Sequence, residues 1–336
     1  MPATTLILGA RDIARLLSME DCITAVEEAF ARHARGETIA PGVLGTHVDG
    51  GGFHVKAAGL RGGAGARDIY AAKINANFPG NPRQHGLPTI QGVIALSDAT
   101  NGRLLALMDS VVITSLRTAA ATAVAAKYLA PAVASVTLCG CGEQGRHQLE
   151  ALACVRTLDR VWVYDIDTDR ARQFATRMSA SLHRDVIAVD DILNVAADTS
   201  AWITCTPSQR WFLGREHVVP GAFVAAVGAD NPDKQEIEPK LLAASAVVAD
   251  VIEQCAAIGD LHHAIDARLM RRQDVRADLA DVVSRRKDVR RSIDEIVIFD
   301  STGTAVEDVA AAVMAYDRAM ECNAGARVEL SGSIRI

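Results

Sequence analysis

The spacing of apolar residues changes along the chain, and the change predicts two kinds of folded region. Residues 11–34 place apolar side chains at helical spacing, and Ser18 is suited to cap a helix that begins at Met19. Short apolar stretches broken by Gly, Pro and Asn follow, and they are typical of a mostly antiparallel sheet. The expected strands are 53–60, 69–78, 90–98 and 104–109, with loops at 62–67 and 79–86. The Asn-Gly pair within 99–102 predicts a hairpin, because it tolerates positive φ.

After residue 115 the pattern becomes an alternation of helices and strands. An alanine-rich helix over 115–129 should end before Pro131. The expected strands are 135–140, 161–165, 186–189, 201–206, 223–230, 246–250 and 297–303; the expected helices are 144–156, 169–182, 190–198 and 307–320. Continuously apolar strands are typical of a parallel sheet covered on both faces, so this part predicts a doubly wound α/β domain. We expect the last helix to pack back onto the first region.

Length and composition limit the classes of protein to which the chain could belong. With 336 residues, 49% hydrophobic and 23% charged, it has material for two domains. A formal net charge of −6 argues against a nucleic-acid surface, and no run of about 18 apolar residues predicts a membrane helix. The N-terminus lacks the basic region of a signal peptide, and seven cysteines do not form a disulfide framework. A cytoplasmic globular protein is expected.

The strongest local motif follows the strand at 135–140. Gly140, Gly142 and Gly145 form G-x-G-x-x-G at the opening of a helix, where the backbone can approach a pyrophosphate. The next strand ends in Asp165, 20 residues after Gly145, where a carboxylate would accept hydrogen bonds from both ribose hydroxyls. No Arg or Lys directly follows Asp165, so the sequence favours NAD over NADP.

No metal site is expected. The cysteines that flank the first two glycines, Cys139 and Cys141, lack further ligands at suitable spacing, so small residues in a tight turn explain them better. His262 and His263 are adjacent, and two adjacent histidines rarely bind the same metal ion.

Four charged residues interrupt apolar segments, where a charge is costly unless it is paired or used. Lys56 and Lys73 lie inside predicted strands, Arg117 lies in the alanine-rich helix, and Asp230 ends the stretch 223–230. A structural ion pair would explain any one of these charged residues. Four such residues in a chain with a nucleotide-binding motif favour a functional role.

Six collinear blocks resemble the ornithine cyclodeaminase/mu-crystallin family: YAAKINANFPGN, GLPTIQGVIALSDATNGRLLALMD, ITSLRTAAATAVAAKYLA, GCGEQG, AVGADNPDKQE and FDSTGTAVEDVA. They span roughly residues 5–325. The resemblance implies an α/β fold in which a doubly wound Rossmann domain (116–304) is inserted in an α+β substrate-binding and dimerisation domain (1–115 with 305–336). It also implies a homodimer.

The resemblance assigns roles to individual residues. Lys73 matches a pocket lysine at the substrate carboxylate and reacting centre, and Asp230 matches the acid that handles the substrate amine or an attacking water. Arg117 matches an arginine close to the cofactor phosphates and the substrate, and Thr302 borders the substrate. The other implied nucleotide contacts, besides the three glycines, are Thr89, Glu143, Gln144, Asp165, Thr206, Val227, Gly228, Lys234 and Ser301.

Two departures from the family pattern bear on the substrate. Family members that act on ornithine carry an arginine where this chain has Val43 or its neighbours, and a glutamate where His54 stands. Lys56 replaces a methionine in that context, and a second cation suits a carboxylate. The favoured function is therefore NADH-dependent reduction of a small α-imino acid, such as a cyclic ketimine carboxylate, or the reverse amino-acid dehydrogenation. The alternatives are an ornithine- or lysine-type cyclodeaminase that uses tightly bound NAD, and a non-catalytic mu-crystallin-like NAD or small-molecule binder.

Overall fold

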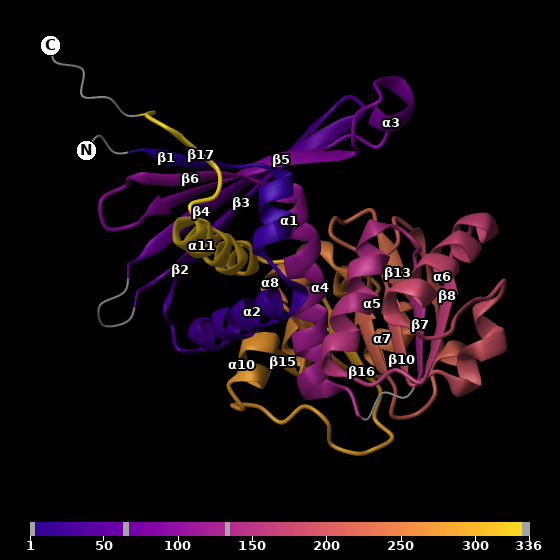
Figure 1. Ribbon diagram of the computed structural model, residues 1–336. Helices are drawn as coiled ribbons and strands as arrows, with labels where there is room; N and C mark the ends of the chain where they lie inside the picture. The colour runs from indigo at the N-terminus through magenta and orange to yellow at the C-terminus, as the bar shows by residue number, and fades with distance from the viewer. Residues whose placement is uncertain (1–3, 63–66, 132–134, 331–336) are drawn as a thin grey trace, which may run out of the picture. The chain divides into compact units, whose positions relative to one another are not determined.

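The computed structural model describes residues 4–62, 67–131 and 135–330 (Figure 1). The chain divides into two compact units. Unit 1 comprises residues 1–117 and 304–336, and unit 2 comprises residues 118–303. The sequence had placed the limits at 115/116 and 304/305. Four of the six positions in the expected loop 62–67 lie outside the described residues.

Unit 1 is built on a seven-stranded sheet. Its order is β17 (Ala326–Val328), β1 (Thr5–Leu8), β6 (Leu104–Asp109), β5 (Ile90–Asp98), β4 (Ile69–Asn77), β3 (Gly51–Leu60) and β2 (Thr38–Val48). Only the β1–β6 pair is parallel, so the expectation of a mostly antiparallel sheet is confirmed for the described residues. The sequence did not predict β1, β2 or β17, because each is short, polar or interrupted by Pro and Gly.

The helices of unit 1 include α1 (Ala10–Leu16), α2 (Met19–Ala34), α11 (Ala305–Cys322) and the start of α4 (Ser110–Leu129). The Ser18 hydroxyl accepts from Asp21 N–H (3.2 Å) and caps α2, as predicted. The last helix does pack against the first region: α11, yellow in Figure 1, contacts α2, β3 and β4. Small buried residues at opposed sheet positions, Ala58 and Ala71, let this alanine-rich helix approach closely.

The structure refines three local predictions for unit 1. The hairpin between β5 and β6 forms, but only Gly102 adopts positive φ (77°), and the connection is longer than a two-residue turn. The segment 79–86 is not wholly a loop: α3 (Asn81–Gln84) forms one helical turn there, with Pro82 in its first turn. The helix expected to begin at residue 115 begins at Ser110, directly after β6.

Unit 2 is a doubly wound α/β domain. Its eight strands pair in parallel, in the order β15 (Ala277–Asp278), β14 (Ala246–Ala249), β16 (Val297–Asp300), β12 (Phe223–Ala226), β10 (Ala201–Thr204), β7 (Ser135–Cys139), β8 (Arg160–Tyr164) and β9 (Val186–Ala188). The strand order reverses between β7 and β10, so the carboxyl ends of these strands form the crevice where such sheets bind ligands. The predicted Rossmann fold is confirmed.

The helices of unit 2 are α5 (Glu143–Val155), α6 (Thr168–Leu182), α7 (Pro239–Ala243), α8 (Ile252–Ile258), α9 (Asp260–Asp266) and α10 (Leu279–Val283). The helix expected at 190–198 is instead a 3₁₀ segment, η1 (Ile192–Asp198). Two further short 3₁₀ segments, η2 (Arg215–His217) and η3 (Arg272–Asp274), and a small sheet of β11 (Gln209–Leu213) with β13 (Gln235–Ile237) complete the unit. Within the described ranges, no helix is long and apolar enough to cross a membrane.

Candidate active site

A buried cluster of charged side chains lies in unit 1. Lys73 of β4 is 4% exposed, and its Nζ lies 2.9 and 2.7 Å from Oδ1 and Oδ2 of Asp308 in the first turn of α11. Thr114 Oγ1, on α4, lies 3.4 Å from the same Nζ. Because strand β4 and helix α11 are both fixed by packing, the lysine is held in one place rather than at the end of a mobile surface chain.

Arg117 belongs to the same cluster. Its Nε donates to Asp308 Oδ1 (2.8 Å) and its Nη1 donates to Glu307 Oε2 (2.9 Å). Asp308 therefore bridges both predicted cations, which confirms that ion pairs compensate their burial. The sequence reasoning missed Glu307 and Asp308. Thr304 followed by Glu307 is the capping-box signature, and it could have placed both acids in the first turn of α11.

The electrostatic environment changes the proton affinities of the cluster. Burial, and then the positive charge of Arg117, lower the pKa of Lys73 to about 7, although Asp308 opposes them. Burial would raise the pKa of Asp308, but Arg117 and Lys73 outweigh it and hold that pKa below its usual value. Lys73 can therefore exchange a proton near neutral pH while its acidic partner stays ionised.

Lys56 is the next cation on this face of the sheet. It lies directly opposite Lys73 in the β3–β4 register and directly opposite Val43 in the β2–β3 register. Its positive charge contributes to the pKa shifts of both Lys73 and Asp308. His54 lies two residues away on the same face of β3, opposite Asn75. Lys56 is half-buried and adds a second cation to this face of the sheet.

The glycine-rich loop of unit 2 has the geometry that a dinucleotide requires. Gly140 has φ +109°, and a Cβ there would lie 2.8 Å from Cys205 O; a Cβ on Gly145 would lie 2.2 Å from Gly140 O. Both positions therefore exclude side chains. A Cβ on Gly142 would instead meet nothing within 4 Å, and no side chain caps α5 behind it. The open N-terminus of this helix fits a pyrophosphate.

Asp165 ties this loop to the end of β8. Its Oδ2 accepts from Cys141 N–H (2.9 Å) and its Oδ1 accepts from Asp167 N–H (3.0 Å), which leaves further lone pairs for ribose hydroxyls. Arg170 Nη1 lies 3.6 Å from the same carboxylate. Arg170, Arg146 and Arg177 line a cavity beside Gly142, a feature that sequence spacing did not reveal.

The other predicted nucleotide contacts of unit 2 follow the carboxyl ends of its strands. They are Glu143 and Gln144 after β7, Thr206 after β10, Val227, Gly228 and Lys234 after β12, and Ser301 after β16, which Thr302 follows directly. Parallel strands bring these ends to one edge of the sheet. Thr89, which precedes β5, lies in unit 1 with Lys56, Lys73 and Arg117.

Buried carboxylates that the sequence reasoning missed hold these loops. Glu236 accepts from Thr206 N–H (2.6 Å), Thr206 Oγ1 (2.7 Å) and Gly228 N–H (2.8 Å). Asp250 accepts from Thr302 N–H (2.7 Å). Burial raises the pKa of Glu236 despite these bonds. The available signal for Asp250 was its place at the end of the predicted apolar strand 246–250, whereas Glu236 lies outside the predicted strands.

Asp230 lies in the loop after β12. Its side chain is 51% exposed, and its Oδ1 is 2.7 Å from Lys234 Nζ. The ion pair fixes two residues that the resemblance assigns to different jobs, substrate and cofactor. Among the residues the structure describes, no group of three or more His, Cys, Asp or Glu is placed to hold a metal ion.

These two sites, a nucleotide-type loop and a buried lysine–carboxylate cluster, have relatives among characterised proteins. The family model of the ornithine cyclodeaminase/mu-crystallin family matches residues 3–323. An alanine dehydrogenase of Archaeoglobus fulgidus is 36% identical over 326 residues, 97% of this chain and 98% of that protein. The chain belongs to the ornithine cyclodeaminase/mu-crystallin family.

Two solved structures are similar over nearly the whole chain. An archaeal alanine dehydrogenase dimer with bound NAD has a TM-score of 0.91 at 34% identity, over 98% of this chain and 100% of that one. The Thermococcus litoralis Δ1-pyrroline-2-carboxylate reductase, in complex with NADH and L-proline, has a TM-score of 0.90 at 29% identity, over 96% and 100%.

Proposed function

We propose that the protein is an NAD-dependent oxidoreductase that reduces the C=N bond of a small α-imino acid, or oxidises the corresponding amino acid. The observation that carries the proposal is Lys73: a buried lysine whose pKa lies at about 7, paired with Asp308 and directly opposite Lys56 on the neighbouring strand. The named activities of the relatives support it, since alanine dehydrogenase and pyrroline-2-carboxylate reductase both act between an amino and an imino acid.

The two opposed lysines explain the substrate class. Lys56 and Lys73 bind the substrate carboxylate, because two cations on opposed strand positions match one anion better than one cation does. The same charges keep the imine carbon electrophilic. Arg117 holds Asp308 in place, and Thr302 borders the substrate.

Reduction of the imine requires a hydride at carbon and a proton at nitrogen. The nicotinamide of NAD supplies or accepts the hydride when bound. Asp230 moves the proton to or from nitrogen, and Lys234 Nζ lies 2.7 Å from its Oδ1.

The glycine-rich loop is the proposed NAD site. Gly142 and the uncapped N-terminus of α5 receive the pyrophosphate, and Asp165 accepts from the adenosine ribose. The predicted contacts Glu143, Gln144, Thr206, Val227, Gly228 and Ser301 line the same edge of the sheet.

A screen of imino acids tests the reaction. Purified protein is incubated with NADH and either Δ1-pyrroline-2-carboxylate or pyruvate with ammonia, and NADH oxidation is followed. In parallel, ornithine and lysine are supplied and ammonia release is measured. Stoichiometric NADH oxidation supports the proposal; ammonia release without net oxidation of NADH would identify a cyclodeaminase instead. Binding of NADH with neither activity would indicate a non-catalytic binder.

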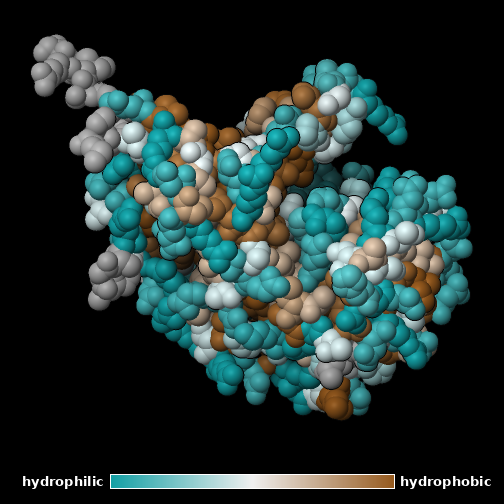
Figure 2. Space-filling view, viewed as in Figure 1, coloured by the Kyte–Doolittle hydropathy of each residue, from teal (hydrophilic) through white to brown (hydrophobic). Residues whose placement is uncertain are grey.

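We also propose a homodimer that forms through the sheet of unit 1. Leu44, Val55, Ile74 and Val93 are directly opposed across β2, β3, β4 and β5, on the face away from Lys73. Leu44, Ile74 and Val93 are 63%, 46% and 45% exposed. Figure 2 shows apolar side chains at the surface of the strands next to α3. An exposed apolar face of this kind is typical of an interface, and one similar structure is a dimer.

Charged substitutions test the interface. The double variant Leu44→Asp with Ile74→Asp should convert a dimer to a monomer in light scattering, because each carboxylate would be buried against its symmetry mate. Ile293→Asp is the matched control, since Ile293 is 81% exposed in unit 2. A double variant that stays dimeric would exclude this face.

A further inference from the structure

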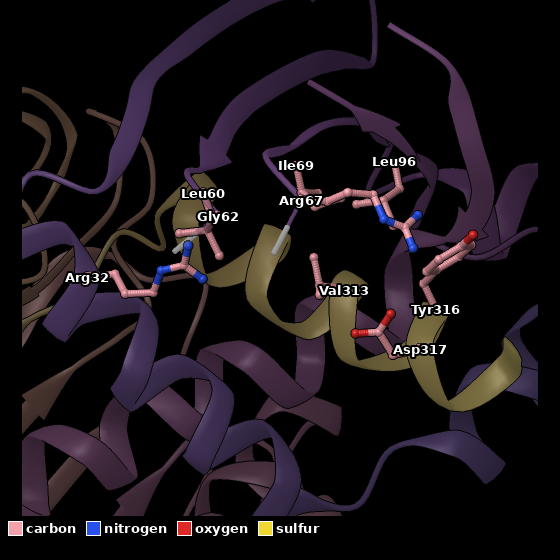
Figure 3. Close-up of a pocket in the computed structure, with 9 residues that line it drawn as sticks. All are labelled: Arg32, Leu60, Gly62, Arg67, Ile69, Leu96, Val313, Tyr316 and Asp317. Carbon is pink, nitrogen blue, oxygen red and sulfur yellow. The ribbon is translucent and has the colours of Figure 1, made fainter. Parts of the chain in front are cut away.

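A second cavity in unit 1 is separate from the charged cluster. It has a volume of about 320 Å³ and lies among α2, the adjoining ends of β3 and β4, and the C-terminal half of α11 (Figure 3). Its size is at the lower end for small-molecule sites. A ligand here would be a metabolite of few atoms rather than a nucleotide.

The wall of the cavity combines one apolar side with charges of both signs. Leu60, Ile69 and Leu96 supply apolar surface from the sheet, and Val313 supplies it from α11. Figure 3 shows the guanidinium of Arg67 extending toward Tyr316 and Asp317, while Arg32 lies on the other side of the cavity.

Arg67 and Asp317 are the two charged side chains of the cavity wall with which a ligand could pair. Burial raises the pKa of Asp317, and the positive charge of Arg67 opposes this rise, so the two side chains sense each other. In the described part of the chain, neither forms an ion pair within 4 Å. Arg32 is already engaged, since it donates to Arg61 O and lies 3.8 Å from Glu37.

A cation and an anion side by side above an apolar floor match an α-amino acid. Its carboxylate would pair with Arg67, its ammonium group would pair with Asp317, and an aliphatic side chain would cover Leu60 and Ile69. A simple carboxylate would leave Asp317 unmatched, and a simple amine would leave Arg67 unmatched.

The cavity shares two elements with the catalytic cluster. Ile69 and Lys73 are four residues apart on β4, about 13 Å at strand rise. Asp308 and Tyr316 are eight residues apart on α11, about 12 Å at helical rise. A ligand seated against Tyr316 therefore contacts the helix that positions Asp308, without contacting Asp308 itself.

We propose that this cavity binds an α-amino acid with an aliphatic side chain, and that the bound amino acid modulates the Lys73–Asp308 cluster through α11. The binding step stands without the proposed function, whereas its effect on turnover rests on that function. Because the active site would itself bind amino acids, the test must separate the two places.

Calorimetric titration with L-leucine, in the absence of nucleotide, separates them. Asp317→Asn and Arg67→Gln should each weaken binding roughly ten- to a hundredfold, since each removes a charge-assisted hydrogen bond. Lys73→Met should bind L-leucine as the parent does. Asp49→Asn, an equal charge change at an exposed residue of the same unit outside the cavity, is the matched control.

Ligand analogues test the class of ligand. 4-Methylpentanoate lacks the ammonium group and 3-methylbutylamine lacks the carboxylate, so both should bind at least roughly tenfold more weakly than L-leucine. The proposal is overturned if L-leucine produces no saturable binding heat, if Lys73→Met abolishes binding while Asp317→Asn retains it, or if 4-methylpentanoate binds equally well.

A kinetic readout completes the test. L-Leucine should change the kcat/KM for imine reduction in the parent and leave it unchanged in Asp317→Asn. If no imine is reduced, the proposed function fails while the titration still decides whether the cavity binds an amino acid. Binding with equal kinetics in both proteins would overturn the modulation.

Discussion

The two units bury charged groups in opposite ways. In unit 1, Lys73 and Arg117 are matched by Asp308 and Glu307 in direct ion pairs. In unit 2, acidic side chains such as Asp300 are buried without such partners and are held by backbone N–H groups, with Leu261 N at 2.9 Å. The first arrangement lowers the pKa of Asp308, whereas burial in the second raises the pKa of Asp300.

The difference follows from what each site must do. The paired cluster keeps Asp308 ionised and lowers the pKa of Lys73 to about 7. A lysine with such a pKa suits substrate binding and proton exchange. Carboxyl groups bonded to loop amides fix backbone geometry instead. Glu236, Asp250 and Asp300 therefore hold the loops that follow the strands of unit 2, and we expect none of them to contact substrate.

Removing one carboxylate from each unit should give the largest difference in the free energy of unfolding. Asp308→Asn leaves Lys73 and Arg117 buried without their shared partner, so the free energy of unfolding should fall by about 3–5 kcal/mol. Asp300→Asn should lower it by about 1–2 kcal/mol, because the amide oxygen still accepts from Leu261 N–H and only the longer bond from Asp260 N–H (3.3 Å) is lost. Urea denaturation of the two variants measures the contrast. Equal losses would show that the units do not differ in this way.

The same contrast predicts opposite dependences of stability on pH. The pKa of Lys73 lies at about 7 in the folded chain and 10.5 is its usual value, so the unfolded chain binds more protons in that window and stability rises with pH across it. Burial, the largest cause, raises the pKa of Asp300 from 3.8 to about 7, so its contribution falls as pH rises through that range. Each effect is at most about 1.4 kcal/mol per pH unit.

Substitution of Lys73 and of Asp300 tests which residue causes each dependence of stability on pH. Denaturation midpoints measured across pH should lose the alkaline rise in Lys73→Met and lose part of the acidic-to-neutral fall in Asp300→Asn. A parent-like alkaline rise in Lys73→Met would contradict the low pKa of that lysine.

The smallest expected effect concerns the cofactor. Asp165→Ala should weaken NADH binding roughly tenfold and shrink any preference over NADPH, because ribose hydrogen bonds are lost. Asp165→Asn is the matched control, since it keeps an acceptor for Cys141 N–H. Arg170→Ala should weaken NADPH more than NADH. Fluorescence titration of both nucleotides measures this; a parent that binds both equally would contradict the assignment of Asp165 as the determinant.

The sequence predicted the parts of the site that depend on short-range patterns. Gly140, Gly142 and Gly145 follow a strand at fixed spacing, and the polar interruptions Lys73 and Arg117 stand out from apolar neighbours. Asp308 could not be paired with Lys73 in advance, because 235 positions separate them and only the packing of α11 on the sheet joins them. Arg170 was missed for a different reason: it is near Asp165 in sequence, but only the geometry at the start of α6 brings it to that carboxylate.

The most direct test of the account is the pH dependence of kcat/KM for NADH-driven imine reduction, compared between the parent and Lys73→Met. The account predicts that the parent profile contains an ionisation near pH 7 from Lys73. Lys73→Met should lose that ionisation and fall at least roughly a hundredfold in kcat/KM, while still binding NADH. A Lys73→Met variant with a parent-like rate and the same profile would contradict the claim that this buried lysine binds the substrate carboxylate at the reacting centre.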